Sequence, residues 1–206
     1  MRTLIALLFI VGGITVAAFP FLQKQYYASE EQKLIDEFRE LDEIFSQEER
    51  DHFSTDNPDV ILSNQENEEG ESPYSSDVIG IIQIDKIDVS LPVLQGATVE
   101  NLNIGAGTIT GTAPIGEKGN TGIAAHRSFT YGRQFNRLDE IELGDIVNVE
   151  TIDGSWDYEV FDISIVVPED VSVLEPMEDE SIITLITCEP MYDPTHRLIV
   201  HAKKLP

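Results

Sequence analysis

The chain contains one cysteine, Cys188, among its 206 residues. A single cysteine cannot form an intramolecular disulfide, and it excludes the paired-cysteine spacings of structural zinc sites. Basic residues are also scarce: 13 Lys and Arg stand against 38 Asp and Glu, a formal net charge of −25. A protein this acidic repels nucleic acid and anionic lipid headgroups. We therefore expect neither a disulfide framework nor a nucleic-acid partner.

Charge is missing altogether from one long segment near the amino terminus. Residues 3–22 carry no charged side chain, and at ~1.5 Å per residue they span the roughly 30 Å hydrocarbon core of a bilayer. Arg2 precedes the segment, and Lys24 followed by Glu30 and Glu31 comes after it, a weak charge bias that favours a cytoplasmic amino terminus. The alternative is a signal peptide cleaved near the small residues at 16–18. We expect residues 1–24 to be a single-pass membrane anchor, with the rest of the chain extracellular.

Acidic residues are concentrated in the next segment, residues 25–77. Apolar side chains recur in its first half at three-, four- and seven-residue intervals, at Tyr27, Leu34, Phe38, Leu41 and Phe45. This spacing predicts an amphipathic helix, which we interpret as resting on the domain that follows. Residues 54–77 are mostly Asn, Asp, Glu, Ser and Pro and predict a flexible spacer.

From residue 78 to residue 206 the pattern is that of β-strands. Short runs rich in Val, Ile, Thr and aromatic residues are separated by Gly, Pro, Asp and Asn; they are VIGIIQI, VSLPVL, GIAAH, DIVNVET, WDYEVFDISIVV, SIITLITC and RLIVHAK. Asp153-Gly154 marks a tight hairpin, a short helix is expected from Thr98, and a turn is expected at 134–138. Seven or eight short strands in one domain predict an all-β fold with short helices, built as a closed or nearly closed barrel.

Three candidate catalytic residues lie at the ends of these β-runs. Cys188 ends one run, Arg197 opens the last run, and His126 ends the run GIAAH. The short loop between the last two runs allows Cys188 and Arg197 to lie on adjacent antiparallel strands. A thiol with a histidine and an arginine nearby is a candidate nucleophile with a proton-transfer partner and a cationic oxyanion donor.

Each of these residues has an alternative interpretation. A free cysteine is often an inert core thiol, so Cys188 could be structural. Of the four histidines, His126 alone ends an apolar run and begins a polar turn, where a general base is usefully displayed. Arg127 competes with Arg197 as the cation. If the strand continues through it, Arg127 points away from His126 and from the thiol, and Arg197 is therefore preferred.

The run Thr184-Leu185-Ile186-Thr187-Cys188 resembles the TLxTC signature of sortases, the membrane-anchored cysteine transpeptidases of Gram-positive bacteria. The similarity extends from about residue 78 to residue 203. GNTGIAAHRS is similar to the sortase strand that delivers the family's histidine, and RLIVHAK to the last strand with its arginine. The resemblance is strongest to class D, with class A as the runner-up. It implies a closed sortase-type β-barrel of seven or eight strands.

The resemblance also implies a mechanism. Cys188 would attack the threonine carbonyl of an LPxTG- or LPxTA-type sorting signal on a surface protein and form an acyl-thioester. Arg197 and the backbone N–H of Glu189 would stabilise the oxyanion, and His126 would act as general acid and base. The amine of a peptidoglycan precursor would resolve the thioester, which would join the surface protein to the cell wall.

The resemblance requires no cofactor. Glu175, Glu178, Asp179 and Glu180 form an acidic run before the cysteine-bearing segment. Calcium needs roughly six to eight converging oxygen ligands. A solvated loop is the simpler interpretation, so we leave calcium out of the expected site.

Two other functions stay open. The first is an L,D-transpeptidase-like cysteine acyltransferase, whose pattern places His-Gly directly before the cysteine, where this chain has Ile186-Thr187. The second is a non-catalytic, membrane-tethered β-domain with Cys188 buried in its core.

Overall fold

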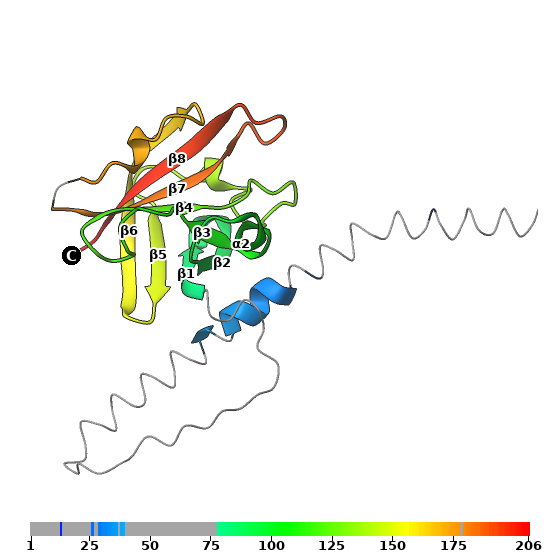
Figure 1. The fold of residues 1–206 in the computed structure, drawn as a ribbon, viewed down its shortest axis with the longest axis horizontal. Helices are drawn as coiled ribbons and strands as arrows, with labels where there is room; N and C mark the ends of the chain where they lie inside the picture. Colours follow the sequence, from blue (N-terminus) through cyan, green and yellow to red (C-terminus); the bar gives the residue numbers. More distant parts are fainter. Residues whose placement is uncertain (1–12, 14–25, 27–28, 37, 40–77, 178) are drawn as a thin grey trace, which may run out of the picture.

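Eight strands pair side by side and close into one barrel (Figure 1). The computed structural model describes residues 13, 26, 29–36, 38–39, 78–177 and 179–206. The strands are β1 (Val78–Ile84), β2 (Val89–Leu94), β3 (Ala106–Thr108), β4 (Gly119–Ala124), β5 (Ile146–Thr151), β6 (Gly154–Val166), β7 (Ser181–Glu189) and β8 (His196–Lys204). Their order around the barrel is β1-β2-β3-β4-β7-β8-β6-β5. The predicted closed all-β barrel is confirmed, with eight strands.

The directions of β4, β7 and β8 bring three strand ends together. β4 runs parallel to β7, with Ala124 in register with Ile186, so both strands finish at the same end of the barrel. β8 runs antiparallel to β7 and therefore begins at that end. The residues after β4, the last residues of β7 and the first residues of β8 are thus neighbours in space.

Alternation along the strands separates the barrel interior from its outer face. The interior residues of β7 and β8 are Ile183, Leu185, Leu198, Val200 and Ala202. All are almost completely buried, and removing a side chain of the size of Leu from water stabilises the fold by about 1.5–3 kcal/mol. Because Thr184, Ile186 and Cys188 alternate with these interior positions, they lie on the outer face, on one side of the strand as predicted.

Short helical turns connect the strands: η1 (Asp85–Ile87), α2 (Val99–Ile104), η2 (Leu138–Glu140) and η3 (Ser172–Leu174). α2 begins where the sequence predicts, because the Thr98 hydroxyl accepts a hydrogen bond from the Asn101 N–H at 3.2 Å. The Asp153-Gly154 hairpin is also confirmed, since it joins β5 to β6 directly.

The sequence does not predict strand β3. Its three residues, Ala106–Thr108, are too few to show alternation. A Cβ on Gly107 would lie 2.6 Å from the Gly96 carbonyl oxygen and 2.7 Å from the Ala97 Cα. Glycine therefore allows β3 to run close to the turn that follows β2.

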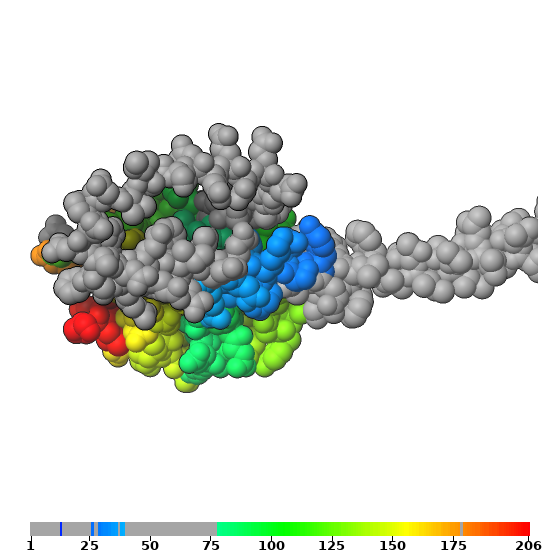
Figure 2. Space-filling model, turned by 90° about the horizontal axis from the view of Figure 1, so that it is seen from below, coloured from blue at the N-terminus to red at the C-terminus, as the bar shows by residue number. Residues whose placement is uncertain are grey.

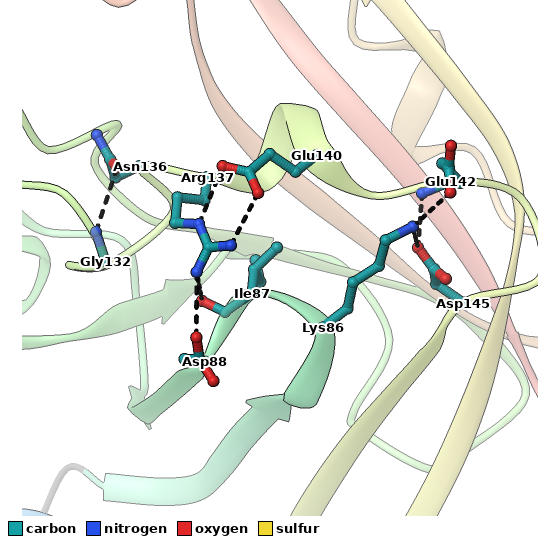
Figure 3. A network of polar contacts seen from close by, with 9 residues as sticks. All are labelled: Lys86, Ile87, Asp88, Gly132, Asn136, Arg137, Glu140, Glu142 and Asp145. Atoms are coloured by element: carbon teal, nitrogen blue, oxygen red, sulfur yellow. Dashed lines mark hydrogen bonds and ion pairs between the residues drawn. The ribbon is translucent and has the colours of Figure 1, made fainter.

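Polar contacts tie the connection between β4 and β5 to the turn between β1 and β2 (Figure 3). Arg137 donates to the Ile87 carbonyl oxygen at 3.1 Å, and it pairs with Asp88 at 3.2 Å and Glu140 at 2.8 Å. Lys86 pairs with two further carboxylates at 2.7 Å each. Exposed pairs of this kind stabilise little individually, but together they hold the far end of the loop that follows β4.

A helical segment near the amino terminus, residues 29–36 and 38–39, lies against the outside of β1 (Figures 1 and 2). Ile35 and Phe38 are buried in a cluster with Ile81. The described part of this segment is helical and rests on the barrel.

Much of the amino-terminal prediction falls outside the described residues. This applies to the anchor at 1–24, of which only Gly13 is described, and to the spacer at 54–77. Among the helices that the structure does describe, none is long and apolar enough to cross a membrane.

Glu31 couples the amino-terminal helical segment to the loop after β4. Its carboxylate lies 3.9 Å from the Arg133 Nε. Burial raises the pKa of Glu31 from its ordinary 4.5 to about 7, and the charge of Arg133 opposes this rise. Between these pKa values the folded state binds more protons than the unfolded state. The stability that this group contributes is therefore complete below the unfolded pKa and is lost as the pH rises through the folded pKa.

Glu31→Gln should remove that loss. We expect it to raise the free energy of unfolding at about pH 8 by up to roughly 3 kcal/mol, and to change it little at about pH 4.5. Denaturant unfolding at the two pH values measures the difference. The exposed Asp36→Asn is the matched control, because it removes one carboxylate from the same helical segment without changing a buried position. An equal effect of Glu31→Gln at both pH values would contradict the prediction.

Candidate active site

Cys188 and Arg197 lie directly opposite each other on the antiparallel strands β7 and β8. Residues paired in this way have Cβ atoms about 4.5–5.5 Å apart. Both residues are partly exposed, and the Arg197 Nη1 donates to the His196 carbonyl oxygen at 2.9 Å. The structure therefore brings the predicted thiol and the predicted cation together on the outer face.

Two hydrogen bonds fix the residue before His126 to the segment before Cys188. The Ala125 N–H donates to the Ile186 carbonyl oxygen at 3.1 Å. The buried Thr187 hydroxyl donates to the Ala125 carbonyl oxygen at 2.9 Å. His126 and Cys188 are the next residues on their two segments, so they lie at the same end of the barrel.

His126 is an exposed residue in the segment that follows β4. Its ring reaches solvent, but partial burial lowers the pKa of the imidazole below its ordinary 6.5. The neutral ring is therefore favoured near neutral pH. A neutral imidazole can accept a proton from a thiol, which is the first requirement for a general base.

Arg127 does not point away from the thiol, and this part of the prediction is wrong. Its side chain is 6% exposed and forms ion pairs with Glu189 and with Asp139, the latter at 2.9 Å. The Arg127 Nη1 also donates to the Cys188 carbonyl oxygen at 3.4 Å. Because β4 ends at Ala124, strand alternation does not extend to the arginine.

Arg127 therefore contacts the main chain of Cys188 and the side chain that follows it. By pairing with Glu189, the residue after the thiol, it ties the end of β7 to the loop that begins at His126. The predicted role of the Glu189 N–H as an oxyanion donor stays a prediction.

The surface that leads to the thiol is the outer face of β4 and β7, called here the β4–β7 face. It consists of Gly122, Ala124, Thr184, Ile186 and Cys188. Gly122 and Thr184 are buried, whereas Ala124, Ile186 and Cys188 are partly exposed. The face is thus covered at one end and open at the end that carries the thiol.

The turn η3 covers the closed end of this face. A Cβ on Gly122 would lie 2.8 Å from the Leu174 Cδ2 and 2.9 Å from the Ile109 Cγ1. Glycine at this position therefore lets two loops meet directly on strand β4.

A pocket of about 520 Å³ lies near the start of β1 and the end of β5 and shares Ile109 with the closed end of the face. Its lining includes Phe38, Val78, Ile109 and Ile152, and none of the three predicted catalytic residues. We therefore place the candidate active site on the β4–β7 face.

Residues 82–205 match the family model of the sortase domain. The chain belongs to the sortase family. Membership makes it a transpeptidase of the sortase type, a group with a cysteine active site, and Cys188 is the one cysteine that this sortase contains.

Similarity extends across most of this sortase. It is 30% identical to Sortase A of Bacillus anthracis over 196 residues, which cover 94% of this chain and 89% of that protein. Its fold is similar to a Clostridium perfringens Sortase D5 transpeptidase, with a TM-score of 0.66, 29% identity, and coverage of 86% of this chain and 99% of that chain. Sortase C1 of GBS Pilus Island 1 gives a TM-score of 0.60 at 32% identity and covers 63% of this chain. This sortase spans 65% of that chain. Because these relatives carry class A, D and C names, the predicted class D assignment stays a prediction.

The acidic run before β7 pairs with lysines. Asp179 lies 2.8 Å from Lys118, and Glu180 lies 2.7 Å from Lys203. Glu178 lies outside the described residues. Within the described part of this sortase, no group of three His, Cys, Asp or Glu side chains is arranged to hold a metal ion.

Proposed function

We propose that this sortase cleaves an LPxTG- or LPxTA-type sorting signal after its threonine and transfers the surface protein to the amine of a peptidoglycan precursor. The observation that carries the proposal is the position of Cys188, opposite Arg197 and beside the segment that delivers His126. One thiol, one base and one cation at one end of a barrel are the parts that acyl transfer through a thioester requires.

Each proton that moves in this mechanism has a donor and an acceptor. Neutral His126 accepts the thiol proton of Cys188, and the thiolate adds to the threonine carbonyl carbon. Arg197 and the Glu189 N–H stabilise the oxyanion. When the C–N bond breaks, the imidazolium of His126 protonates the departing amine and leaves an acyl-thioester.

The second half of the reaction, attack of the amine on the thioester, uses the same groups in the reverse order. The acceptor amine attacks the thioester carbon, and His126 removes the proton that this amine must lose. The thiolate of Cys188 then leaves and recovers a proton from the imidazolium. The lowered pKa of His126 supports this cycle, because the ring begins in its neutral form.

The exposure of Cys188 supports catalysis over the alternative of a structural thiol. The cysteine is partly exposed, while its neighbours on the strand, such as Leu185, fill the core. We also propose that residues 1–24 anchor the protein in the cell membrane, with the catalytic domain at 78–206 outside the cell.

Incubation with an LPxTG or LPxTA peptide should add the acyl fragment to Cys188 and release the fragment that follows threonine. Intact-protein and peptide mass spectrometry would detect both products. A peptide of the same composition in scrambled order is the control. If the scrambled peptide forms the adduct equally well, or if a thiol reagent alkylates Cys188 but neither sorting-signal peptide acylates it, the proposed substrate class is wrong.

A further inference from the structure

His201 makes two hydrogen bonds on the outer face of β8, although it is only 7% exposed. Its Nδ1 lies 3.1 Å from the Asp162 Oδ2, and its Nε2 lies 2.9 Å from the Val173 carbonyl oxygen. Both partners are acceptors. A carbonyl oxygen can only accept, so the Nε2–H of the ring donates to Val173.

The second acceptor belongs to η3, the turn that covers the β4–β7 face. The Val173 carbonyl oxygen also accepts from the Asn120 Nδ2 at 3.0 Å and the Thr184 Oγ1 at 3.3 Å. Donors from β4, β7 and β8 therefore converge on one carbonyl of the turn. Of the three, the His201 ring is the one that also contacts a carboxylate, and this second contact fixes its orientation toward the turn.

A local irregularity in β6 supplies that carboxylate. The pairing of β6 with β8 shifts register between Val160 and Asp162, so that Asp162 lies opposite His201. Phe161 is the extra residue, and its ring lies 5.9 Å from the His201 ring. A bulge of this kind re-aims the side chains that follow it. Here it places a negative charge behind a histidine that already faces the turn.

The position of η3 matters for Cys188 because both lie along the β4–β7 face. Thr184 and Cys188 are four residues apart on β7 and share its outer face, which separates them by roughly 13 Å. An extended peptide of about four residues that reaches Cys188 along this face would therefore end at η3. The position of Leu174, packed onto Gly122, then limits where such a peptide can lie.

We propose that His201 is a positioning residue that holds η3 on the β4–β7 face and thereby sets the affinity for the sorting-signal peptide. The proposal rests on the proposed function, because the peptide is the substrate that the face would hold. It assigns His201 no part in the bond-making steps, since the ring lies in register with Thr184 and not with Cys188.

The experiment uses His201→Val, which removes both hydrogen bonds, and His201→Gln, which can still donate to the turn. We expect His201→Val to raise KM for a sorting-signal peptide by about tenfold, with kcat within about twofold, because the loss of one buried hydrogen bond has an effect of roughly this size. His201→Gln should recover part of the affinity. Lys203→Gln is the matched control on the same strand, since its half-exposed ion pair reaches the far end of the same connection, and it should change neither parameter.

A second measurement needs no substrate. In His201→Val the amides of Leu174 and Glu175, which close the turn, should exchange hydrogen faster, while β8 stays protected. Unchanged KM and unchanged exchange would overturn the proposal. So would a joint fall of kcat and Tm at constant KM, because that result marks a purely structural residue. If the wild-type enzyme turns over no sorting-signal peptide, the proposed function fails, and the exchange measurement still decides whether His201 holds the turn.

Discussion

Cys188→Ala is expected to abolish both sorting-signal cleavage and transpeptidation while it leaves the fold intact. This sortase has no second cysteine to substitute for the nucleophile. Loss of a nucleophile in another hydrolase lowers kcat on the order of 10⁶-fold. The thiol is small and partly exposed, so its removal should cost far less than the ~2–5 kcal/mol of a large core deletion. Chromatography of the cleaved peptide and a thermal melt measure the two effects.

Cys188→Ser provides the matched variant for this experiment. It keeps the shape of the side chain but replaces the thiol with a polar and far less acidic hydroxyl, so it should be as inactive as the alanine variant and, at this partly exposed position, melt close to the wild-type temperature. Residual cleavage of the sorting signal by Cys188→Ala at a substantial fraction of the wild-type rate would show that another group is the nucleophile.

Most of the barrel can be predicted from the sequence because most of its strands are long enough to show their pattern. The runs VIGIIQI and VSLPVL coincide with β1 and β2 residue for residue. The strand β3 has no such signal, since its three residues take their conformation from the close approach of Gly107 to the preceding turn. Its existence depends on contacts between segments and not on local pattern.

The predicted catalytic residues share a feature that sequence can show: each lies where an apolar run meets a polar turn. Cys188 and Arg197 are opposite each other because a short loop joins their strands. The residues that support the site lack any comparable signal. Arg127 reaches Glu189 because β4 ends early, and Asp162 reaches His201 because β6 contains an irregularity. Neither the early end of β4 nor the irregularity in β6 follows from composition or periodicity.

Substitutions of the two arginines near the thiol should have different effects on activity and stability. Arg197 faces Cys188 across the strands, so its loss should act on the transition state. Arg197→Ala is expected to lower kcat/KM by about a hundred- to a thousandfold, the effect of removing one oxyanion donor, with little change in Tm. Arg197→Lys should also lose much of the activity, because lysine keeps the charge but lacks the planar pair of donors.

Arg127→Ala should instead lower stability and activity together. Its guanidinium is almost completely buried between Glu189 and Asp139, and its removal leaves both carboxylates without their partner. Those carboxylates are partly exposed, so the cost should fall below the ~3–5 kcal/mol of a fully buried pair. Steady-state kinetics combined with thermal melts separate the two roles. If Arg127→Ala keeps the wild-type Tm but loses catalysis, while Arg197→Ala stays active, then Arg127 is the oxyanion donor and Arg197 is not.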